Sequence, residues 1–209
     1  MEINILDFRP AGYAYLLEKF ALAGMPNWHS SAVSTTGTHY SKIQDGFVEE
    51  VFRIQYWPGE KVGDHLEFAL KYDGVNLGLL TRIFEKASQD ELIEHIKSKP
   101  TGKYARRIWF FYEFLCGKQL PLDDMTSGNY VGALEAKDYY TVQHGEKSSR
   151  HRIVNNLLGL KSFCPVVRRT EKLGKLDSSD LRKRCEDIVS AYPPELLRRT
   201  LRYLYNKET

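Results

Sequence analysis

Three neighbouring residues in this 209-residue chain are of types that ligate metal ions. Asp64, His65 and Glu67 offer two carboxylates and an imidazole. If this segment is helical, Asp64 and Glu67 share a face at i, i+3 while His65 points away. Two donors on one face are too few for zinc, and no Cys-x-x-Cys or His-x-x-x-His pair supplies the rest. We therefore expect no metal site and no bound cofactor, and we place Asp64 near the start of a helix.

Cysteine thiols are the candidate nucleophiles of the chain, and they occur as Cys116, Cys164 and Cys185. Their wide spacing and odd number favour reduced thiols, and no local motif pairs one of them with a histidine. Cys116 follows directly on an aromatic, apolar segment, which favours a structural role for its thiol. Because the N-terminal MEINILDFRP is also unlike a signal peptide, a cytoplasmic protein is expected.

Basic residues gather in the last third of the chain. Residues 1–143 hold 15 Lys and Arg against 19 Asp and Glu, whereas residues 144–209 hold 15 against 8. Such asymmetry is typical of a nucleic-acid surface, of a face that meets an acidic protein, or of a solvated basic surface. The runs carry no interleaved aromatics and match no nucleic-acid-binding motif, so nucleic acid is the less favoured partner. The candidates for phosphate contact are Arg150, His151, Arg152, Arg168, Arg169, Arg182, Lys183 and Arg184.

The segment from residue 193 to 209 is the stronger candidate for binding, and it indicates a protein partner. Leu197, Leu201 and Leu204 follow a helical stripe, with arginines on the opposite side. A stripe of this kind most often packs within its own domain, but with flanking arginines it is also the composition of a partner-facing helix. The residues predicted to contact the partner are Arg198, Arg199, Arg202, Tyr203 and Tyr205, with Arg182 and Arg184 as supporting charges.

The elements that position these residues are predicted to be mainly α-helical, forming a helical bundle with a minor β element around residues 129–143. The aromatic helix near 104–116 should be its buried centre, with a core on Trp109, Phe111 and Leu115. Residues 27–45, rich in Ser, Thr, Gly and His, are expected to form an exposed loop, and 46–56 a short strand or helix. Helices are expected over 9–23, 64–71, 76–87, 88–97, 104–116, 149–158 and 179–191, and from 193 onward.

Length and composition allow one good core or two small ones. We expect residues 1–143 to form a helical core region, with the basic region 144–209 packed on it as part of one compact unit. The chain is 42% hydrophobic and 27% charged, an ordinary balance for a globular protein. It contains no run of about 18 apolar residues, so no membrane span is expected.

Four blocks of the sequence resemble the region that precedes the catalytic core in a group of bacterial Fic-family proteins, which are AMP-transferring enzymes. The blocks are GDHLEFALKYDGVNL (63–77), KPTGKYARRIWFFYEFLCGKQLPLDD (99–124), DDMTSGNYV (123–131) and AYPPELLRRTLRYLYNKET (191–209). The signature loop of that family, His-Pro-Phe leading into Gly-Asn-Gly-Arg, does not occur in these residues. Because the loop supplies the family's general base and phosphate cradle, the resemblance implies a non-catalytic accessory region.

On this resemblance, the chain is expected to be a regulatory region that binds a protein, namely a Fic core in the same chain or in a separate one. In the relatives, the region following Thr209 would carry an inhibitory serine-containing helix and then the Fic core. Two alternatives stay open. The chain could be a stand-alone inhibitor or antitoxin-like protein that binds another bacterial or phage-targeted protein complex, or a nucleic-acid-binding module that uses its basic last third.

Overall fold

The computed structural model describes residues 8–22, 27–37, 39–177 and 180–208. The chain divides into two compact units, Met1–Val167 and Arg168–Thr209, and each is described by itself. The division falls later than the boundary expected after residue 143, so residues 144–167 belong to the first unit.

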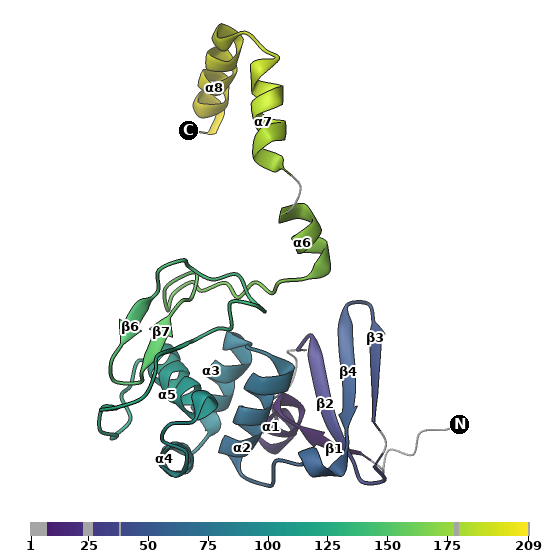
Figure 1. Ribbon diagram of the computed structural model, residues 1–209, viewed down its shortest axis with the longest axis vertical. Helices are drawn as coiled ribbons and strands as arrows, with labels where there is room; N and C mark the ends of the chain where they lie inside the picture. The colour runs from purple at the N-terminus through teal and green to yellow at the C-terminus, as the bar shows by residue number, and fades with distance from the viewer. Residues whose placement is uncertain (1–7, 23–26, 38, 178–179, 209) are drawn as a thin grey trace. The chain divides into compact units, whose positions relative to one another are not determined.

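A four-stranded sheet opens the first unit, with the strand order β1-β2-β4-β3 (Figure 1). Strands β1 and β2 are antiparallel, as are β3 and β4, whereas β2 and β4 run parallel. The turn between β3 and β4 uses Asp45 and Gly46, both at positive φ, which is the conformation of a two-residue hairpin turn. The strands are β1 (Phe8–Ala11), β2 (His29–Ser34), β3 (Tyr40–Gln44) and β4 (Phe47–Phe52).

The prediction of a mainly α-helical bundle is wrong, because this sheet occupies much of the region predicted as loop. Residues 27–45 contain β2 and β3, and the helix predicted over 9–23 is divided into β1 and α1 (Tyr13–Lys19). Strand β2 reads HSSAVS, and its buried positions include His29 and Ser31. Polar residues therefore stand on the inward face, and the alternation of apolar and polar residues that marks a strand is hidden.

The helices of the central region agree closely with the prediction for residues 64–116. Trp109 and Phe111 are buried in the main core, as predicted, whereas Leu115 is only partly buried at its edge. Asn76 caps α3 by accepting the N–H of Leu79 at 3.1 Å. The elements are η2 (Ile54–Tyr56), α2 (Val62–Phe68), η3 (Ala69–Asp73), α3 (Leu77–Lys86), α4 (Gln89–Ser98) and α5 (Lys103–Cys116).

A second, three-stranded sheet follows α5, in the order β5-β7-β6. The minor β element predicted around 129–143 overlaps only β5, and the helix predicted over 149–158 contains β7 instead. The local sequence of residues 149–158 does not reveal this, because Arg150 and His151 pair with Glu113 of α5, which is distant in the sequence. The strands are β5 (Val131–Gly132), β6 (Glu146–Ser148) and β7 (Ile153–Asn155).

A buried polar junction at Asp73 joins the first sheet to the helices. The Asp73 carboxylate accepts the backbone N–H of Tyr13 at 2.9 Å, the hydroxyl of Ser31, and His29 Nδ1 at 3.1 Å. The other ring nitrogen of His29 lies 3.0 Å from Glu50 Oε2. Burial lowers the pKa of His29, but its bonds to Asp73 and Glu50 outweigh burial and raise it above the ordinary value. The junction is therefore a buried hydrogen-bond network that satisfies polar groups inside the fold.

The described residues of the second unit form three helices: α6 (Glu171–Asp177), α7 (Leu181–Ser190) and α8 (Pro194–Glu208). Helices α7 and α8 confirm the segments predicted over 179–191 and from 193 onward. Asp180 caps α7 by accepting the N–H of Lys183 at 3.0 Å. Among the described residues, no helix is both long and apolar enough to cross a membrane.

Candidate functional site

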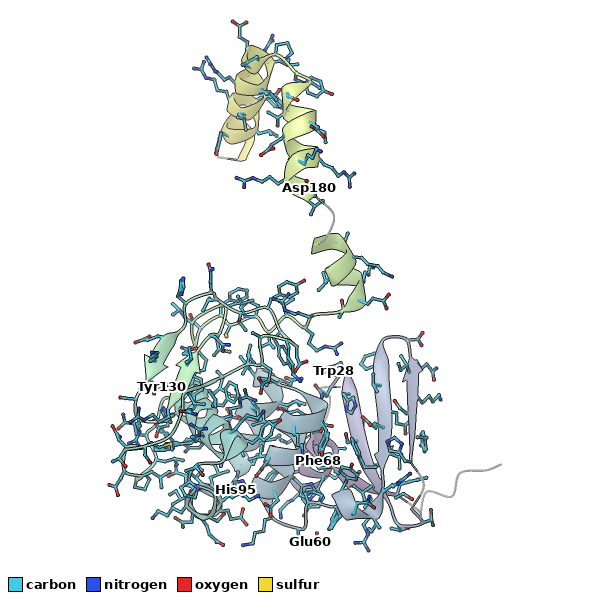
Figure 2. All side chains as sticks on the ribbon, viewed as in Figure 1. Trp28, Glu60, Phe68, His95, Tyr130 and Asp180 are labelled. Carbon is cyan, nitrogen blue, oxygen red and sulfur yellow. The ribbon has the colours of Figure 1, made fainter. Side chains whose placement is uncertain are left out.

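The residues predicted to contact a protein partner all lie on α7 and α8 of the second unit. Asp180, labelled in Figure 2, marks the start of α7, whose residues are all exposed. On α8, Tyr203 is 65% exposed and Tyr205 is 72% exposed. Arg198, Arg199 and Arg202 are exposed as well. The structure therefore places the predicted residues on two consecutive helices, where their side chains are exposed.

Many apolar side chains on and next to these helices are exposed to solvent. Leu181 and Ile188 of α7 recur at helical spacing, Tyr192 follows just after the helix ends, and each of the three is more than half exposed. On α8, Leu201 and Leu204 are about half exposed. We call this set the C-terminal apolar set: Leu181, Ile188, Val189, Tyr192, Leu196, Leu201, Tyr203, Leu204 and Tyr205.

The arginines of α8 lie opposite its leucine stripe. Arg198, Arg199 and Arg202 follow one another at i, i+1 and i+4, on the side of the helix away from Leu201 and Leu204. In the part of the chain that the structure describes, no ion pair involves these three arginines, whereas Arg182 of α7 lies 3.4 Å from Glu186. Helix α8 thus presents an apolar side and a positively charged side.

The basic run at residues 150–152, a nucleic-acid candidate in the sequence, is used within the first unit. Arg150 contacts both carboxylate oxygens of Glu113 at 3.0–3.2 Å, and His151 Nε2 lies 3.0 Å from Glu113 Oε2. Arg152 donates to the carbonyl of Thr126 at 2.9 Å. These side chains brace the fold, and the remaining candidates, from Arg168 to Arg184, belong to the other unit. The run at residues 150–152 is therefore committed to contacts within its own unit rather than left available for phosphate contact.

Glu113 is an organising residue that the sequence analysis did not single out. Besides Arg150 and His151, its carboxylate accepts Trp109 Nε1–H at 2.7 Å and the N–H of Leu120 at 3.0 Å. Burial alone would raise the pKa of Glu113, but these bonds hold it below the ordinary value. The sequence does contain a feature that could have identified Glu113: it is the one carboxylate in the most aromatic helix. A charge buried in such a helix requires polar partners from elsewhere in the fold.

The cysteines do not form a catalytic arrangement. Cys116 and Cys164 are partly buried, and burial raises the pKa of both thiols, which disfavours the nucleophilic thiolate. Cys185 is exposed on α7. All three thiols are unbridged in the structure.

The acidic pair on α2 acquires a partner that its local spacing did not predict. Asp64 and Glu67 face His95 of α4, whereas His65 points away from them, as predicted. His65 is buried, stacked on Tyr15 with ring centroids 3.6 Å apart, and its Nε2 lies 2.8 Å from the carbonyl of Gly59. The sequence analysis missed His95 because that residue comes from a different helix.

Comparisons with protein-family models, with curated proteins and with solved structures find no match for this chain. The resemblance to Fic-family accessory regions therefore stays a hypothesis drawn from the sequence. Among the features described above, α7 and α8 carry the clearest functional signal, because their apolar side chains are exposed rather than used in a core.

Proposed function

We propose that the unit Arg168–Thr209 is a docking module that binds a folded protein domain and that its role is regulatory. The single observation that carries this proposal is the exposure of the C-terminal apolar set. Two short amphipathic helices that bury none of these side chains lack a core of their own. A partner that covers the leucine stripe would supply that core and gain the free energy of apolar burial.

The chemistry of α8 specifies the partner. Its leucine stripe suits an apolar groove, and Arg198, Arg199 and Arg202 suit an acidic rim beside that groove. Tyrosine and arginine are enriched at protein interfaces, which supports the assignment of Tyr203 and Tyr205 to the contact. The resemblance to Fic-family accessory regions makes a Fic catalytic core, in the same chain or a separate one, the partner to test first.

The same proposal assigns no AMP transfer to residues 1–209. Its basis is the sequence, which contains neither the family's signature histidine nor its phosphate-binding loop. Incubation of the purified chain with labelled ATP should leave candidate target proteins unlabelled. Specific labelling of a target by the chain alone would overturn this part of the proposal.

A direct binding experiment tests the docking role. Titration of the chain with a separately expressed Fic core in a calorimeter should show saturable binding. Arg198→Glu/Arg202→Glu should weaken it at least tenfold, and Leu201→Asp should do the same by placing a charge in the stripe. Lys118→Glu/Lys137→Glu, which reverses two exposed charges in the first unit, is the matched control and should bind like the wild type.

The outcomes separate the competing functions. Binding that survives both α8 variants would show that the proposed surface is wrong. If the Fic core does not bind, cross-linking in bacterial lysate through a residue of α8 tests for another protein, as the inhibitor or antitoxin alternative requires. Recovery of nucleic acid alone, with affinity that falls steeply as salt is added, would favour the nucleic-acid alternative and reject the protein-docking role.

A further inference from the structure

Three potential metal ligands come together between helices α2 and α4. Asp64 and Glu67 lie one turn apart on α2, and His95 of α4 faces both of them. One donor atom from each residue can be chosen so that all three lie within 4.8 Å of one another. Figure 2 labels His95 on its helix. The third donor that the local sequence lacks is thus supplied by tertiary packing.

The His95 ring is buried, yet one of its nitrogens has no hydrogen-bond partner. Its side chain is only 4% exposed, and Nε2 is buried without a partner. Nε2 lies 3.4 Å from Glu67 Oε2, but the contact lacks hydrogen-bond geometry. A buried polar atom without a partner is unusual in a folded protein and requires an explanation. A cation bound between this nitrogen and the Glu67 carboxylate would supply the missing partner.

The spacing of these two atoms suits shared coordination of one ion. Ligand atoms at about 2.0–2.1 Å from a tetrahedral zinc ion lie about 3.3–3.4 Å apart, and Nε2 and Oε2 are separated by 3.4 Å. Asp64 Oδ1 lies 3.5 Å from the other ring nitrogen, His95 Nδ1. Donor atoms of the three residues lie within 4.8 Å of one another, so coordination by all three requires the Asp64 carboxylate to turn toward Nε2.

Lys99 shows that this position favours positive charge. Its ammonium lies 3.1 Å from Asp64 Oδ1 and 2.8 Å from Glu67 Oε2, bridging the two carboxylates. The Lys99 side chain is 43% exposed at the C-terminal end of α4, where it can move into solvent. The ammonium therefore competes for the place that a metal ion would take.

A surface pocket of about 330 Å³ leads to the cluster. Asp64, His95 and Lys99 line it together with Lys61, Glu91, Glu94 and Ser98. Glu94 is paired with Lys61 at 2.8 Å, so Glu91 is the additional carboxylate that would attract a cation, and water in the pocket could fill a fourth coordination position.

We propose that Asp64, Glu67 and His95 form a binding site for a divalent transition-metal ion, with zinc as the favoured ion. His95 Nε2 and one oxygen from each carboxylate are the ligands, and a water molecule completes a tetrahedron. Imidazole selects zinc over magnesium or calcium, which prefer sites made only of oxygen. Binding replaces the Lys99 ammonium, so the lysine acts as a built-in competitor of the metal.

The test is a titration of the full chain with zinc alone in a calorimeter, supported by absorption spectra of the cobalt-substituted protein. One zinc ion should bind per chain. His95→Gln and Glu67→Gln should each weaken binding at least tenfold, whereas Lys99→Met, which removes the competing charge, should tighten it severalfold. His39→Gln and Cys185→Ser, which alter exposed candidate ligands elsewhere, are the controls and should bind zinc as the wild type does.

Each result decides the proposal. Circular dichroism of every variant shows whether the protein is still folded, so that loss of a ligand can be told from unfolding. If His95→Gln does not fold, Glu67→Gln tests the ligand set in its place. Absence of zinc binding in Lys99→Met would overturn the proposal and leave the cluster as an ion-pair network. Unchanged affinity in both ligand variants, or loss of binding in Cys185→Ser, would place the metal elsewhere and also overturn it.

Discussion

Gly63 of α2 lies directly against the imidazole of His95. A Cβ atom added at Gly63 would stand 2.2 Å from His95 Cγ and 2.5 Å from His95 Nδ1. Any side chain at position 63 would therefore displace the ring from the face of α2. The glycine is required here by close approach of two helices, since its backbone is helical.

Gly63→Ala should lower the free energy of unfolding by about 1–3 kcal/mol, because the overpacked His95 and α4 must shift. Alanine favours a helix over glycine by about 1 kcal/mol, so a net loss shows that the clash dominates. Urea denaturation measures the change. Gly174→Ala, at a helical position with no atom within 4 Å of the added Cβ, is the control and should not reduce helicity. A Gly63→Ala protein as stable as the wild type would contradict the packing described.

Trp109→Ala should lower the free energy of unfolding by about 3–5 kcal/mol, since the side chain is 3% exposed in the main core. Trp109→Phe keeps an aromatic ring but loses the N–H that Glu113 accepts at 2.7 Å. We expect the phenylalanine variant to cost less, about 1–3 kcal/mol. Chemical denaturation of both variants gives the comparison, and equal losses would show that the hydrogen bond, not the ring, carries the effect.

Glu113→Gln should destabilise the chain by about 2–4 kcal/mol, because it leaves the guanidinium of Arg150 without its main carboxylate partner. Arg150 keeps bonds to the carbonyls of Leu120 and Leu122 and to Asp124, which limits the loss. A double-mutant cycle with Arg150→Met, followed by urea denaturation, should give a coupling energy of about 1–3 kcal/mol. Additive single losses would mean that the two side chains stabilise the fold independently.

His65 should make the protein less stable as the solution becomes acidic. Burial lowers the pKa of His65 to about 4, and its Nδ1 has no partner that could accept a proton from the charged ring. The unfolded chain binds this proton near pH 6.5, so stability is complete above that pH and falls between 6.5 and about 4. The loss should be about 2–3 kcal/mol.

Denaturation at a series of pH values measures this dependence, and the comparison with His65→Gln isolates it from other titrating groups. The variant should show a flatter profile between pH 6.5 and 4. His39→Gln, which removes a half-exposed histidine, should keep the profile of the wild type. Parallel profiles for His65→Gln and the wild type would assign the acid sensitivity to another group.

The helices from residue 62 to 116, and those after residue 180, were predictable from the sequence because their signals are local. Apolar residues at helical spacing, Asn76 before α3 and Gly117 after α5 define the central helices without reference to the rest of the chain. The burial of Trp109 and Phe111 follows from an aromatic run that covers α5 nearly all round. The exposed arginines of α8 follow from its amphipathic pattern.

The first sheet and the acidic cluster were decided only by tertiary structure. Strand β2 can bury His29 and Ser31 because Asp73, far away in the sequence, provides the partner that makes their burial favourable. In the same way, His95 becomes a neighbour of Asp64 and Glu67 only because Gly63 lets α4 approach α2. Local sequence patterns show which side chains are apolar. The pairing of buried polar groups depends instead on contacts between segments, which only the folded chain brings together.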